Sequence, residues 1–160
     1  MHETVIRLVV LAGLVAPGIV ALAQDQKLAQ SSPSADASGV KYFSKEDVTA
    51  SFAKGGTLVN ENNYKVMTAH RTEDGNVEVH NSFTDVFYIV QGSTDIVTGG
   101  KVIGVKNANP DEPRGDSIEG GETRHLAAGD SLVIPPGIPH WMKNVQGNLQ
   151  YFVVKVKKPA

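Results

Sequence analysis

GDSLVIPPGIPHWMKN, residues 129–144, is the most informative stretch of the chain. It begins as a short apolar run, turns at residues 135–137, and then places His140 next to Trp141. Proline fixes φ at about −65° and glycine adopts backbone conformations that other residues avoid, so a Pro-Pro-Gly turn is rigid. A rigid turn of this kind fixes the direction of the imidazole that follows it.

The rest of the chain after Gly56 has the sequence pattern of short strands. Short apolar or alternating runs recur after Gly56, and turn residues separate them. We expect strands at 57–59, 64–71, 77–81, 85–91, 94–98, 101–105, 123–127, 131–134 and 149–156. Many short strands with regular turn signals predict an all-β sandwich or barrel.

The N-terminal part of the chain has a different composition. Residues 8–23 are almost wholly apolar and end in Ala21-Leu22-Ala23, which predicts a signal peptide that is cleaved after Ala23. A membrane anchor is the alternative, but the segment is short for a span, which needs about 20 apolar residues. Residues 24–43 are polar and predict a disordered linker, so the folded domain is expected over residues 44–160.

One short helix is expected at the start of the folded domain. Ser44 and Asp47 have the spacing of a capping box, in which each side chain bonds the other residue's backbone N–H. The helix is predicted to run to about Ala53 and to stop at Gly55-Gly56.

Charge and composition exclude several classes of function. The formal net charge is −2 and no basic face is clustered, which argues against binding of nucleic acid or of an anionic membrane. The chain has no cysteine, so disulfides, thiolate ligands and lipid attachment to a cysteine are excluded. Any metal site must therefore use nitrogen and oxygen ligands.

A second stretch, VEVHNSFTDVFYIVQG at residues 77–92, offers partners for His140. Strand alternation places Glu78 and His80 on one face and Val77 and Val79 on the other. We expect the valine face to pack outward, against another sheet or another subunit. Asp85 opens the next expected strand, so Glu78, His80 and Asp85 are predicted to converge at one end of an interior.

These two stretches resemble the two conserved motifs of the cupin superfamily. The second cupin motif, G(X)5PXG(X)2H(X)3N, is matched at every fixed position, by Gly129, Pro135, Gly137, His140 and Asn144.

The first cupin motif, G(X)5HXH(X)3,4E(X)6G, is matched only in part. His80 fits its second histidine and Gly92 fits its closing glycine. Glu78 stands in place of the first histidine, Asp85 in place of the glutamate, and Thr72 in place of the opening glycine. The chain thus looks like a small, exported single-domain cupin with a degenerate first motif.

The resemblance implies a cupin barrel, that is, a double-stranded β-helix or jelly roll, preceded by a short helix. It also implies a divalent metal ion, and the positions that match the family's ligands are Glu78, His80, Asp85 and His140. This ligand set suits Fe, Mn or Zn, without selecting one of them. A barrel without metal is the alternative, with the carboxylates serving packing and hydrogen bonding. Cupins also often form dimers, so a homodimer is possible.

Two functions are compatible with this resemblance. The first is a metal-dependent enzyme that acts on a small organic molecule, as an oxygenase, isomerase or lyase. The second is a non-catalytic barrel that binds a sugar or an organic acid. The signal peptide predicts export, to the periplasm or as a secreted protein.

The remaining candidates have structural interpretations. His70 and His125 lie on expected strands and are predicted to be structural, because a lone histidine on a strand is seldom a ligand. Lys155 shares a strand face with Tyr151 and Val153, but a lysine near a strand end is expected to face solvent. The polar stretch 106–121 is long for a loop and is interpreted as a lid or rim over a pocket.

Overall fold

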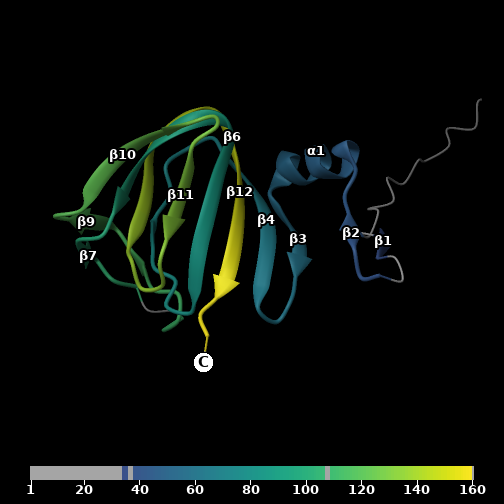
Figure 1. Cartoon of the computed structure of the whole chain (residues 1–160). Helices are drawn as coiled ribbons and strands as arrows, with labels where there is room; N and C mark the ends of the chain where they lie inside the picture. Colours follow the sequence, from purple (N-terminus) through teal and green to yellow (C-terminus); the bar gives the residue numbers. More distant parts are fainter. Residues whose placement is uncertain (1–33, 36–37, 107–108, 160) are drawn as a thin grey trace, which may run out of the picture. The chain divides into compact units, whose positions relative to one another are not determined.

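The computed structural model describes residues 34–35, 38–106 and 109–159 (Figure 1). The predicted signal peptide and its cleavage after Ala23 lie outside these residues. Part of the predicted linker is described, and there β1 (Ser34–Ala35) pairs antiparallel with β2 (Lys41–Tyr42). No helix in the described part of the chain is long and apolar enough to cross a membrane.

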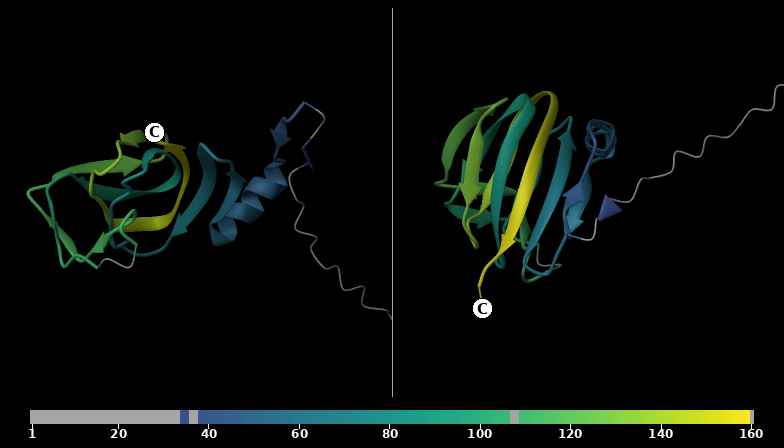
Figure 2. Two further views of the ribbon diagram at one scale, coloured as in Figure 1. Left: turned by 90° about the horizontal axis from the view of Figure 1, so that it is seen from below. Right: turned by 45° about the vertical axis from the view of Figure 1, so that its right-hand side comes forward.

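The described residues form an all-β fold with one helix, as predicted. Its main sheet has eight strands: β3 (Gly56–Asn60), β4 (Tyr64–Arg71), β5 (Val77–Glu78), β6 (Phe83–Thr98), β8 (Arg114–Gly115), β10 (Glu122–Ala127), β11 (Ser131–Ile134) and β12 (His140–Lys157). A separate pair joins β7 (Lys101–Ile103) to β9 (Ser117–Glu119). The strands curve round into a barrel, which is seen nearly end-on in Figure 2.

Two long strands connect the two halves of the barrel. The sheet order is β10-β6-β12-β4-β3, and β11 pairs with the first half of β6 while β10 pairs with the second half. β12 also pairs with β6 along both halves, with register shifts between Lys143 and Tyr151. Each of these strands therefore bends and contributes to both halves, and the cupin fold expected from the motifs is confirmed.

The prediction of two separate strands at 85–91 and 94–98 was wrong. Both runs belong to β6, which passes through Gly92 without ending. Gly92 has φ 76°, and a Cβ there would lie 2.8 Å from the carbonyl oxygen of Gln146 and 2.9 Å from Cα of Leu149. The glycine thus bends the strand where its neighbour comes close, instead of ending it.

Helix α1 (Lys45–Lys54) confirms the prediction from the capping box. The Ser44 side chain accepts a bond from the Asp47 backbone, the Asp47 carboxylate accepts one from the Ser44 backbone, and Gly55 ends the helix. The helix buries Phe52, whose ring meets Phe152 edge-on at 5.0 Å between centroids. It therefore packs on the outside of the barrel, next to β3 and β4 (Figure 1).

Alternation correctly places Val77 and Val79 on the face opposite Glu78 and His80, which line the cavity. Val77 is fully buried and Val79 is 7% exposed within the single chain. The chain itself covers this face, and residues 113–115 run alongside it: β5 pairs with β8, and the Val79 N–H donates to the Pro113 carbonyl. This valine face is therefore not available to a second subunit.

Candidate metal centre

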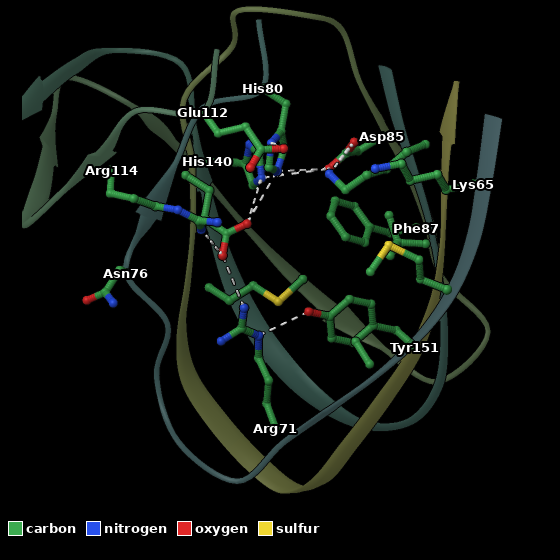
Figure 3. Close-up of a pocket in the computed structure, with 16 residues that line it drawn as sticks. Lys65, Arg71, Asn76, His80, Asp85, Phe87, Glu112, Arg114, His140 and Tyr151 are labelled. Carbon is green, nitrogen blue, oxygen red and sulfur yellow. Dashed lines mark hydrogen bonds and ion pairs between the residues drawn. The ribbon is translucent and has the colours of Figure 1, made fainter. Parts of the chain in front are cut away.

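The barrel encloses a cavity of about 390 Å³ (Figure 3). Strands β4, β5, β6 and β12 supply most of its wall, and the stretch 106–121 supplies Glu112 and Arg114. That stretch, expected as a lid or rim, includes β8 and β9 and contributes side chains to the cavity. All four predicted ligands line the cavity: Glu78, His80, Asp85 and His140.

Three of these residues form a compact group of possible ligands. One ligand atom from each of Glu78, His80 and His140 lies within 4.8 Å of the other two. Glu78 Oε2 is 3.3 Å from His80 Nε2 and 3.9 Å from His140 Nε2. Glu78 and His140 come together because they are register partners across β5 and β12. These three residues could hold a metal ion.

The second-motif turn holds the two imidazoles in relation to each other. Gly137 has φ 78°, and its N–H donates to the His80 carbonyl at 2.9 Å. The ring centroids of His80 and His140 are 5.3 Å apart. After the turn, Asn144 takes a left-handed conformation, with φ 50°, at the irregular part of β12. The motif's fixed positions therefore correspond to backbone conformations that bring His140 to His80.

Both histidines present a buried Nε2 atom toward Glu78. His80 and His140 are 5% and 4% exposed, and the Nε2 atoms of both have no hydrogen-bond partner in the described part of the chain. His140 Nδ1 lies 3.2 Å from the Ile138 carbonyl, which accepts the proton of that nitrogen and leaves the lone pair on Nε2. Buried nitrogens without partners are rare in folded proteins, and a metal ion would satisfy them. The donor set therefore fits a metal.

Burial keeps His140 neutral. It lowers the pKa of His140 below the ordinary value of 6.5, and this effect outweighs the attraction of the Glu78 and Asp85 carboxylates. A neutral imidazole is the form that binds a metal, so the centre does not require a proton to leave His140 at neutral pH.

Glu78 presents its two oxygens to different neighbours. Oε2 faces the two histidines, whereas Oε1 lies 2.5 Å from Arg114 Nη1 and 3.4 Å from Arg71 Nη2 (Figure 3). Burial alone would raise the pKa of Glu78, but the nearby His80 imidazole and the charge of Arg114 outweigh it and lower the pKa to about 2. The two arginines therefore orient an ionised carboxylate with one free oxygen toward the imidazoles.

Asp85 is close to the group but already has a partner. Its Oδ2 is 3.5 Å from His80 Nε2 and 4.0 Å from His140 Nε2, and the Lys155 ammonium binds both of its oxygens, at 2.7 and 2.9 Å. The expectation that Lys155 faces solvent was wrong, because its side chain is 13% exposed and points into the cavity. The role of Asp85 as a metal ligand stays a prediction.

Four further charged residues of the cavity were not singled out from the sequence: Arg71, Glu112, Arg114 and Lys65. Arg71 could have been found, since it shares an alternation face with Met67 and Ala69. Arg71 donates from Nε to the Tyr151 hydroxyl at 3.0 Å, which places a polar group on the cavity floor. No sequence signal indicated Arg114, because its position depends on the long-range pairing of β5 with β8.

His70 and His125 lie outside this group. The His125 side chain is 62% exposed and lies 2.8 Å from Asp95, away from the cavity. His70 lies near the C-terminal end of β4, next to the polar turn that follows this strand. Neither belongs to the group of possible ligands.

The chain belongs to the cupin family, whose model matches residues 57–160. A comparison with curated proteins gave no match. Among solved structures, KdgF from Halomonas sp. is 13% identical over 66% of this chain and 80% of its own, with a TM-score of 0.48. A cupin-2 domain protein from Shewanella frigidimarina is 16% identical over 71% of this chain and 93% of its own, also with a TM-score of 0.48.

A longer structure is also similar. The DMSP lyase DddQ from Ruegeria pomeroyi is 14% identical over 64% of this chain, with a TM-score of 0.46, and the matched part is 46% of its length. The chain thus spans less than half of that protein. The family assignment rests on the sequence match over residues 57–160.

Proposed function

We propose that the protein is a metal-dependent enzyme that acts on a small organic molecule inside the barrel. The observation that carries the proposal is the convergence of two buried, unpartnered imidazole nitrogens and one free carboxylate oxygen, from His80, His140 and Glu78. They face a cavity of about 390 Å³, which is in the range of small-molecule sites.

Glu78, His80 and His140 would hold the metal, and Asp85 is the proposed fourth ligand. Two histidines with carboxylates suit Fe, Mn or Zn. With three or four protein ligands, a coordination position remains for a substrate. When bound, the metal supplies a Lewis acid that polarises a carbonyl or hydroxyl oxygen.

The chain's own residues would bind and orient the substrate. Phe87, Met67 and Val153 form an apolar wall, and the Tyr151 hydroxyl lies at the floor. Burial raises the pKa of Tyr151 despite the nearby Arg71 charge, so the phenol keeps its proton and can donate it in a hydrogen bond. Oxygenase, isomerase and lyase reactions are all compatible with this site.

The proposal is tested by removing the metal with a chelator and adding Fe, Mn or Zn back singly. A metal that binds only the folded protein stabilises it by about 2.7 kcal/mol at a hundredfold excess over Kd, so the melting temperature should rise. The rise should be lost in His80→Ala. If no metal shifts the wild-type melting temperature, the proposal fails.

A second measurement separates an enzyme from a binding barrel. Turnover that stops after chelation and returns with the metal supports the enzyme. A ligand that binds without turnover, and equally well in His80→Ala, would instead support a non-catalytic barrel. We also propose export to the periplasm or beyond it, on the basis of residues 8–23.

A further inference from the structure

Three charged residues form one row across the wall of the cavity. Lys155 on β12 is the register partner of Lys65 on β4 and of Asp85 on β6, and all three side chains line the cavity. Residues directly opposite each other on neighbouring strands lie close together, and like charges in such a pair are destabilising. The row holds two ammonium groups and one carboxylate.

Only one of the two lysines in this row forms an ion pair with its carboxylate, Asp85. Lys155 binds both oxygens of Asp85. Within residues 34–35, 38–106 and 109–159, no carboxylate oxygen lies within 4.0 Å of Lys65 Nζ, whose recorded neighbour is the Phe83 ring at 5.3 Å. One ammonium group at the cavity is therefore left without a counter-ion.

The whole cavity has the same excess of positive charge. Four cationic side chains line it, namely Lys65, Arg71, Arg114 and Lys155, against three carboxylates, namely Glu78, Asp85 and Glu112. A divalent metal ion would add two more positive charges. A cavity lined by an excess of one sign of charge attracts ligands of the other sign.

The next row of the same wall is apolar. Met67, Val153 and Phe87 are register partners across β4, β12 and β6, two residues along from Lys65, Lys155 and Asp85. Because side chains two apart on a strand point to the same face, these three form a second layer directly beside the charged one. A ligand that fills both layers has a charged head and a hydrocarbon body.

The charged row also adjoins the candidate metal centre. Asp85 Oδ2 lies 2.7 Å from Lys155 Nζ and 3.5 Å from His80 Nε2. The row therefore runs from Asp85, beside the metal ligands, through Lys155 to Lys65 on β4, and a ligand held at Lys65 shares the cavity with the metal centre.

We propose that the ligand of this cavity is a small organic carboxylate, with its carboxylate on Lys65 and its hydrocarbon body against Met67, Val153 and Phe87. One unpaired ammonium matches a singly charged head, which favours a carboxylate over a phosphate. The inference that this carboxylate is a substrate rests on the proposed function. The preference of the cavity for an anion does not depend on the metal.

The test compares matched acids and amides by calorimetric titration of the chelator-treated protein. Benzoate with benzamide, and hexanoate with hexanamide, differ in charge but hardly in shape, and inorganic phosphate is the third probe. Each acid should bind about tenfold more tightly than its amide, as for a charge-assisted contact. Lys65→Met should remove this difference and leave amide binding unchanged.

Two control variants make the result specific. Lys101→Met removes an exposed lysine outside the cavity and should change nothing. Lys65→Arg keeps the charge and should keep the preference for acids, which separates the loss of charge from a loss of folding.

Several results would overturn the proposal: equal binding of acid and amide, tighter binding of phosphate than of either acid, an unchanged preference in Lys65→Met, or no binding of any probe at millimolar concentration. The test is also separable from the metal hypothesis. A protein that binds no metal but prefers acids through Lys65 would refute the proposed enzyme and support this inference.

Discussion

The ammonium group of Lys155 binds both carboxylate oxygens of Asp85, at 2.7 and 2.9 Å. The Oδ2 atom of the same carboxylate lies within 4.0 Å of the Nε2 atoms of His80 and His140. Asp85 occupies the position where the first cupin motif has its glutamate. The residue at a ligand position is therefore bound to a lysine, and release of this carboxylate is coupled to breaking a buried ion pair.

Lys155→Met tests this coupling. Asp85 is 2% exposed, so removal of its partner leaves a buried charge and should lower the metal-free stability by about 3–5 kcal/mol. The freed carboxylate should then complete the ligand set, and the stabilisation on adding metal should exceed that of wild type. Urea unfolding with and without metal measures both effects, with the exposed Lys157→Met as control. An equal metal effect in variant and wild type would contradict Asp85 as a potential ligand.

Arg114→Gln tests the orientation of Glu78. Arg114 lies 2.5 Å from Oε1, the oxygen that faces away from the histidines. Loss of residues that orient a ligand typically costs 10–100-fold in metal affinity, and we expect a drop of about that size. Competition with a fluorescent chelator measures it. Arg124→Gln, which removes an exposed arginine paired with Glu122, should leave the affinity unchanged. A drop of the same size in both variants would contradict a specific role.

The metal-free protein should lose stability as the pH falls. The folded-state pKa of His140 is lowered, so between that value and the ordinary 6.5 the unfolded chain binds more protons and stability falls. The pKa of Glu78 is lowered from 4.5 to about 2, so its stabilising contribution is lost in turn across that lower window. The urea midpoint from pH 8 to pH 2 measures both windows. His140→Gln should flatten the upper window, and an unchanged slope there would contradict the assignment.

Gly92→Ala should destabilise the barrel more than Gly147→Ala does. Both glycines have positive φ, at 76° and 66°, so alanine should cost roughly 1–2 kcal/mol at either position. At Gly92 the new Cβ would also meet the backbone of Gln146 and Leu149, whereas nothing lies within 4 Å at Gly147. Thermal unfolding measures the difference, and equal losses would show that the close approach at Gly92 relaxes freely.

The features predicted correctly are those that depend on local rules. The capping box at Ser44 and Asp47 fixes α1, and alternation places Glu78 and His80 on one face. The Pro-x-Gly turn places His140 beside His80 in the cavity. The spacing of the motif residues identifies the family.

The features that were missed depend on long-range register. Alternation gives Lys155 the same face as Tyr151, but only its pairing with Asp85 across β12 and β6 shows that it points inward. Arg114 reaches Glu78 because β8 pairs with β5 from a stretch without strand periodicity. Val77 and Val79 are covered within the single chain, which alternation alone does not decide. Sequence patterns set the face of a strand, whereas the covering segment decides whether that face is exposed.

The most direct test of the account is the metal content of purified protein, by plasma mass spectrometry after loading with Fe, Mn or Zn. His140→Ala removes a buried nitrogen of the proposed centre, and His125→Ala removes an exposed imidazole outside it. We predict close to one metal ion per chain in wild type and in His125→Ala, and its loss in His140→Ala. Absence of metal from wild type, or equal content in all three proteins, would contradict a metal centre at Glu78, His80 and His140.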